Sequence, residues 1–190
     1  KPRNDRNTER MTFAQFSVKE KKWEDYILNV KKLAYLSISV ALAMAFSFIE
    51  SQMPPLASVP GVKIGLANIV TVFLLYNMGA KEAAATSLIR VFLSSLLFGS
   101  AVSLIYSLSG AALSFLFMLI FKRLKLFSTV GVSVIGGVMH NAGQIIAAAF
   151  VMGTAKIALY LPVLIISGVI AGVAVGFAAG ILTSRLKGKI

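Results

Sequence analysis

Residues 157–183 read IALYLPVLIISGVIAGVAVGFAAGILT, a continuous apolar run without one charged side chain. A helix crosses the hydrocarbon core of a bilayer with about 20 such residues, because each residue advances it by about 1.5 Å. Over all 190 residues, 57% are hydrophobic and 14% charged, whereas about a quarter of an ordinary soluble domain is charged. The composition predicts an all-α integral membrane protein and argues against a soluble enzyme or a disordered chain.

Five further apolar segments precede this run. They lie at about 33–49, 62–78, 83–98, 101–121 and 130–152. The segment at 83–98 is marginal for a span and is expected to tilt or to be shielded by its neighbours. Residues 50–61 contain three prolines, which forbid a continuing helix, while only Gly99 and Ser100 separate the third and fourth segments. The pattern predicts a six-transmembrane-helix bundle over residues 33–183.

The basic residues predict the topology. Lysine and arginine number 19 against 7 acidic residues, a formal net charge of +12. Six spans place nearly all basic clusters on the side of the two termini, and the opposite loops hold only Lys63 and Lys156. The positive-inside rule then makes both termini cytoplasmic. This placement at segment ends argues against nucleic acid as a partner and favours a multi-pass protein of a prokaryotic plasma membrane.

Basic tails flank the predicted bundle. Residues 1–32 form the N-terminal tail, in which an interfacial amphipathic helix and an unstructured segment are the two alternatives. Residues 184–190 form a basic cytoplasmic tail at the other end.

Small residues recur at helical spacing in two segments. In the last segment, glycines four residues apart predict a groove for close helix packing, within the bundle or with another subunit: Gly168, Gly172, Gly176 and Gly180. The first segment carries two small-residue rows, so one can pack inside the bundle while the other meets a partner: Ser37, Ala41 and Ala45, and Ser39, Ala43 and Ser47.

Polar side chains within the apolar segments are the candidate ligand-binding residues, since charge inside a bilayer is costly. Lys63 lies at the outer end of the second segment, where snorkelling to the interface is the alternative, and Asn68 lies deeper. Arg90 lies near the middle of the third segment. All seven acids lie in the tail or at segment ends, so no acid within a span is expected to pair with Arg90. An anionic ligand or a set of helix carbonyls remains as its partner.

The fifth segment contributes the remaining candidates, in the stretch GGVMHNAGQ. His140 and Gln144 are four residues apart and therefore share a helix face. Asn141 points about 100° away and either joins them or bonds a neighbouring helix. The six residues together predict a small-molecule site in the outer half of the bundle, which the proline-containing loop at 50–61 would close.

Missing motifs exclude several activities. The chain has no G-x-x-x-x-G-K-[ST] motif for nucleotide hydrolysis and no acid-rich motif to hold magnesium on a diphosphate. One histidine and no cysteine make a zinc site improbable. The chain is therefore expected not to be an enzyme and to use no metal or cofactor.

Four stretches together resemble a known family: VPGVKIGLANIVTVFLLYNMGAKEA, SLIRVFLSSLLFGS, SLSGAALSFLFMLIFKR and FSTVGVSVIGGVMHNAGQ. They are similar to the Gx transporter family, also known as heptaprenyl diphosphate synthase component I, over about residues 33–183. That family resembles the substrate-binding S components of energy-coupling factor (ECF) transporters. The combination of VKIGLAN and HNxGQ carries the resemblance.

The resemblance implies a six-helix bundle that captures a small, anionic metabolite from the outer face. It implies three partners, one transmembrane coupling subunit and two ATPases, which dock on an A-x-x-x-A face matched here by Ala41 and Ala45. Associations of the family suggest a flavin-like, prenyl phosphate-like or quinone-precursor-like ligand. Two alternatives stay open: a non-catalytic membrane subunit of heptaprenyl diphosphate synthesis, and a self-associating channel or scaffold.

Overall fold

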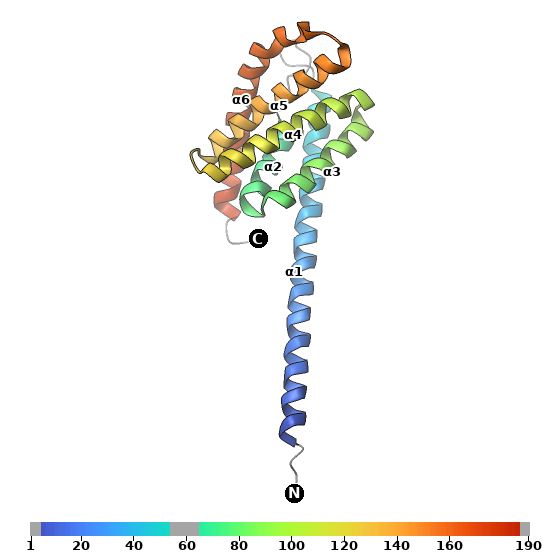
Figure 1. Cartoon of the computed structure of the whole chain (residues 1–190), viewed down its shortest axis with the longest axis vertical. Helices are drawn as coiled ribbons and strands as arrows, with labels where there is room; N and C mark the ends of the chain where they lie inside the picture. Colours follow the sequence, from blue (N-terminus) through green and yellow to red (C-terminus); the bar gives the residue numbers. More distant parts are fainter. Residues whose placement is uncertain (1–4, 54–64, 187–190) are drawn as a thin grey trace. The chain divides into compact units, whose positions relative to one another are not determined.

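The computed structural model describes residues 5–53 and 65–186, and within these ranges every regular element is a helix. The elements are α1 (Asp5–Gln52), α2 (Leu66–Asn77), α3 (Ala80–Phe98), α4 (Ala101–Leu124), α5 (Thr129–Met152), the short 3₁₀ helix η2 (Ala155–Tyr160) and α6 (Leu161–Leu186) (Figure 1). The prediction of an all-α fold with six helices is confirmed for the described part of the chain.

The chain divides into two compact units, residues 1–38 and 39–190, and helix α1 contributes to both. In the first unit, α1 is already helical from Asp5, and the ring of Trp23 meets that of Tyr26 edge-on with centroids 6.1 Å apart. The placement of residues 1–32 on a membrane surface stays a prediction. The second unit contains the helix bundle and the candidate site.

Four helical stretches are long and apolar enough to cross a membrane: Tyr26–Gln52, Ala101–Leu124, Thr129–Met152 and Ala155–Leu186. The chain is therefore a multi-pass membrane protein. The other two helices fall short of the predicted spans for different reasons. Helix α2 has 12 residues, a length of about 18 Å, and α3 carries three charged residues, Lys81, Glu82 and Arg90.

Helix α2 forms the centre of the bundle. Leu74 and Leu75 are completely buried, as expected for a helix that is apolar all round. Each of the other α-helices contributes buried side chains to the same core: Ala43 of α1, Ala83 of α3, Met118 of α4, Val132 of α5, and Val175 and Ala179 of α6. A short helix thus serves as the core against which the long helices pack.

Opposite charges hold the two ends of α2. At its N-terminus, the Glu50 carboxylate accepts hydrogen bonds from the backbone N–H groups of Gly65 and Leu66, the latter at 3.0 Å. At its C-terminus, the Lys122 ammonium donates to the carbonyl of Leu75 and lies 5.0 Å from the centroid of the Tyr76 ring. Both charges complement the helix dipole and thereby fix the position of α2.

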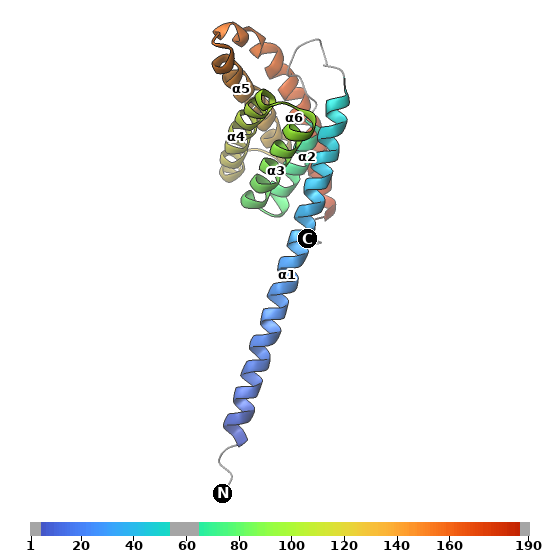
Figure 2. The same ribbon diagram turned by 90° about the vertical axis from the view of Figure 1, so that its right-hand side faces the viewer.

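Glycines bring α6 against α5, and both views show α4, α5 and α6 side by side (Figure 1, Figure 2). A Cβ atom on Gly168, Gly172 or Gly176 would lie 2.5–3.0 Å from atoms of α5. Gly180 differs, because a Cβ there would meet nothing within 4 Å. Three of the four predicted groove glycines therefore face α5, and the fourth faces open space.

Candidate functional site

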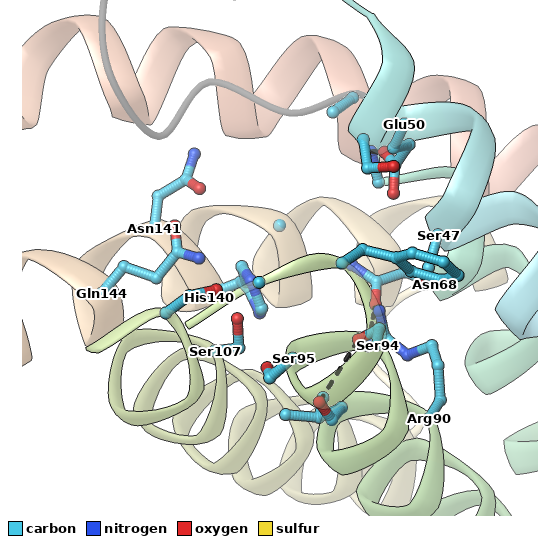
Figure 3. A pocket seen from close by; sticks show the side chains of 18 of the residues that line it. Ser47, Glu50, Asn68, Arg90, Ser94, Ser95, Ser107, His140, Asn141 and Gln144 are labelled. Carbon is cyan, nitrogen blue, oxygen red and sulfur yellow. Dashed lines mark hydrogen bonds between the residues drawn. The ribbon is translucent and has the colours of Figure 1, made fainter. Parts of the chain in front are cut away.

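A polar cavity of about 120 Å³ lies inside the second unit, and residues from or beside all six helices line it (Figure 3). Five of the six predicted ligand-binding residues meet there: Asn68, Arg90, His140, Asn141 and Gln144. The sixth, Lys63, lies outside the described residues, as does 54–61 of the loop expected to close the site. Helices far apart in the sequence thus bring the predicted polar groups to one place.

Arg90 enters the cavity from the middle of α3. Its Nη2 atom donates to the side-chain oxygen of Asn68 at 3.4 Å, longer than the usual range of about 2.7–3.2 Å. Its Nε atom is buried and has no hydrogen-bond partner in the described part of the chain. One edge of the guanidinium is therefore buried without a counterpart, which is costly for a charged donor.

Glu50, which the sequence places at the end of the first segment, also lines this cavity, and no hydrogen bond joins it to Arg90 in the described structure. Glu50 directly follows the first predicted membrane segment, so it was not counted among the polar residues within the segments. Its Oε1 atom is already engaged by the two amides of the α2 N-terminus. The hydrogen bonds of Glu50 therefore serve the N-terminus of α2.

The opposite wall of the cavity comes from α5. His140 and Gln144 lie one turn apart and both line the cavity (Figure 3). Gly110 of α4 makes room for them, since a Cβ there would lie 2.9 Å from Gln144 Cγ and 3.0 Å from His140 Cε1. Next to it, Ser109 donates to the carbonyl of Gly143 at 2.8 Å and joins the two helices. A side chain at Gly110 would therefore displace the imidazole or the amide.

Asn141 lines the cavity but also joins α5 to α6. Its Nδ2 atom donates to the carbonyl of Leu164 at 2.6 Å and to the hydroxyl of Ser167 at 3.3 Å. Of the two roles that the sequence left open, the bond to a neighbouring helix is therefore observed. Any contact with a ligand would use its remaining carboxamide oxygen.

Serine hydroxyls, which were not among the predicted ligand-binding groups, complete the lining. They come from three helices: Ser47 and Ser51 of α1, Ser94 and Ser95 of α3, and Ser103 and Ser107 of α4. A signal for them exists, because Ser94 follows Arg90 by four residues and Ser107 follows Ser103 by four. The buried hydroxyl of Ser47, like Arg90 Nε, has no hydrogen-bond partner in the described structure.

The predicted docking residues lie elsewhere. Ala41 and Ala45 are exposed, whereas Ala43, from the other small-residue row, is 1% exposed and belongs to the core. Among the described residues, no group of three histidine, aspartate or glutamate side chains could hold a metal ion. The cavity is therefore a set of hydrogen-bonding groups around one guanidinium, an arrangement suited to binding a polar molecule.

Comparison with known proteins finds one similarity. A profile of the family described as heptaprenyl diphosphate synthase component I matches residues 39–182, and so spans the whole bundle from α1 to α6. No curated protein and no solved structure matches the chain.

Proposed function

We propose that this chain, which belongs to the heptaprenyl diphosphate synthase component I family, is the substrate-binding subunit of an energy-coupling factor transporter. It captures a small polar metabolite in the cavity between its helices and releases it after reorientation against a coupling subunit. The chain itself is not an enzyme, and two partner ATPases supply the energy.

One observation carries the binding role. The two buried side-chain atoms without a partner in the described structure, Ser47 Oγ and Arg90 Nε, both belong to residues that line this cavity. Buried polar groups are nearly always hydrogen-bonded, so two exceptions at one place point to a missing partner. A scaffold or lipid-facing bundle would satisfy these groups from its own backbone.

The outer surface of α1 supports docking of the coupling subunit. Ala41 and Ala45 leave a side of the helix nearly bare, so a partner helix can approach closely in the membrane. The basic residues at the ends of α4 and α6 support a cytoplasmic position of the C-terminus, where the ATPases would lie.

The partners can be identified by affinity purification of the tagged chain from membranes of its native host, followed by mass spectrometry. We expect a polytopic coupling subunit and two ATPases. Ala45→Trp should abolish their recovery because the indole blocks close approach, whereas Ala112→Trp on the exposed side of α4 should not. Equal recovery with both variants, or no ATPase with the wild-type chain, would contradict the proposal.

The family description favours a second candidate, a non-catalytic membrane subunit of heptaprenyl diphosphate synthesis. In that case the same purification recovers a soluble prenyl synthase in place of ATPases. Loss of the chain would then lower prenyl synthesis in isolated membranes, and no uptake activity would depend on Arg90.

A further inference from the structure

The charges around the cavity restrict what it can hold. Among the described lining residues only Arg90 and Glu50 carry a formal charge, so the wall has one of each sign. Glu50 is compensated by two backbone amides and by the N-terminal end of the α2 dipole. Arg90 has one long hydrogen bond and one unpaired buried donor. The uncompensated charge is therefore a single positive one.

A ligand with one negative charge balances this wall, whereas one with two or more does not. The second negative charge would face the carboxylate of Glu50 in a medium of low dielectric constant, where like charges repel strongly. A monoanion meets only the free edge of Arg90.

The shape of that edge favours a carboxylate. The Nε–H and one Nη–H of arginine point in parallel, and this spacing matches the two oxygens of a carboxylate in a bidentate pair. Nε is free, and Nη2 is held only by the long bond to Asn68. A phosphate monoester carries close to two charges at neutral pH and fits the charge balance less well.

The volume limits the size of the ligand. The cavity measures about 120 Å³, which is below the ~150 Å³ of an engineered cavity that binds benzene. A second, separate cavity of about 20 Å³ lies between α2, α4, α5 and α6, beside Val72, Met118 and Val175. The second cavity has room for about one water molecule, so the interior space beside Arg90 favours a compact ligand over an isoprenoid chain or a flavin ring system.

Polar side chains elsewhere in the cavity can form hydrogen bonds with the rest of the ligand. His140, Gln144 and the serine hydroxyls face the cavity from α3, α4 and α5 (Figure 3). A ligand with polar groups can hydrogen-bond to Gln144 and to the hydroxyl of Ser47, which is buried and has no partner in the described structure, whereas a purely apolar acid cannot.

We infer that the substrate is a compact monocarboxylate, smaller than a substituted benzene, that bears hydroxyl or amide groups and a single net negative charge. Its carboxylate pairs with the free edge of Arg90, its polar groups meet the α5 wall, and Glu50 excludes multiply charged anions. This inference rests on the proposed function as a binding subunit and narrows its ligand.

The test uses the full-length chain in detergent and measures its melting temperature. A metabolite extract of the host is separated by anion exchange into neutral, singly charged and multiply charged fractions, and a lipid extract is tested beside them. We expect only the singly charged fraction to stabilise the chain. Amidation of its carboxylates with carbodiimide and methylamine should abolish the effect, and phosphatase treatment should not.

Two variants sharpen the test. Arg90→Gln should raise the amount needed for a half-maximal shift at least about thirtyfold, since it removes one partner of a buried charged hydrogen bond. Glu50→Gln keeps an oxygen acceptor for the α2 amides but loses the negative charge, so the multiply charged fraction should begin to stabilise the chain. If Arg90→Gln does not fold, the comparison of native and amidated fractions on the wild-type chain still shows whether the ligand binds through a carboxylate.

The outcomes separate this inference from the proposed function. Stabilisation by the multiply charged, neutral or lipid fraction, or an effect that phosphatase removes, overturns the monocarboxylate while leaving a binding protein. If no fraction stabilises the wild-type chain, the binding function fails and the monocarboxylate with it.

Discussion

Replacing Gly172 by alanine is expected to push α5 and α6 apart. The new Cβ would lie 2.5 Å from Val134 Cα and 3.0 Å from the carbonyl oxygen of Ser133, whereas ordinary contacts begin at 3.4 Å. The neighbouring atoms are backbone and cannot rotate away. The two helices must therefore separate locally by about 0.9 Å, and such overpacking costs about 1–3 kcal/mol.

Gly180→Ala provides the matched control on the same helix. A Cβ at this position meets nothing within 4 Å, so the substitution adds no contact. Its only expected effect is the gain in helix propensity of alanine over glycine, about 0.5–1 kcal/mol.

The assay is thermal unfolding of the purified chain in detergent, followed by circular dichroism at the helix band and by size-exclusion recovery. Fluorescence of the single tryptophan, Trp23, does not serve because it lies in the other compact unit. Gly172→Ala should melt several degrees below the wild type, and Gly180→Ala at or slightly above it. Identical melting of both variants would refute close packing of α6 against α5 at Gly172.

Three further substitutions test contacts that position the site, each by the same melting assay. Glu50→Ala should cost about 1–3 kcal/mol because it leaves two backbone donors of α2 without an acceptor, and Glu50→Gln should recover most of the loss. A Gln variant as unstable as the Ala variant would contradict the capping role. Asn141→Leu should cost about 1 kcal/mol through its lost bonds to α6, whereas Ser107→Ala should change little. Equal effects would mean that Asn141 does not join the helices. Lys122→Met should cost about 1 kcal/mol, since it removes a cation from the C-terminal end of α2, and exposed Lys125→Met should not. A reversed order would refute this role of Lys122.

Much of the candidate site follows from spacing within single helices. The costs of burying charge identify Arg90, and the i, i+4 relation identifies His140 and Gln144 as neighbours. The cavity contains all three. The same rule applied to serines would have added Ser94 and Ser107, but serine is common in membrane helices and has no comparable cost of burial.

Other features of the site and the packing could not be predicted from the sequence. Glu50 stands at the end of an apolar segment, where an acid ordinarily faces water, and only its contact with the start of α2 brings it to the cavity wall. Gly180 continues a regular glycine row, yet α5 and α6 no longer meet at that point. Periodicity describes the faces of one helix and says nothing of where a neighbouring helix begins or ends.

The amino-acid sequence by itself determined that this is a multi-pass helical membrane protein with rare polar groups inside it, because composition and hydropathy are properties of each segment alone. The tertiary structure decided that the short helix α2 is the core and that an acid shares the cavity with Arg90. These depend on contacts between residues far apart in the chain, where packing and charge compensation select one arrangement among many that the same helices allow.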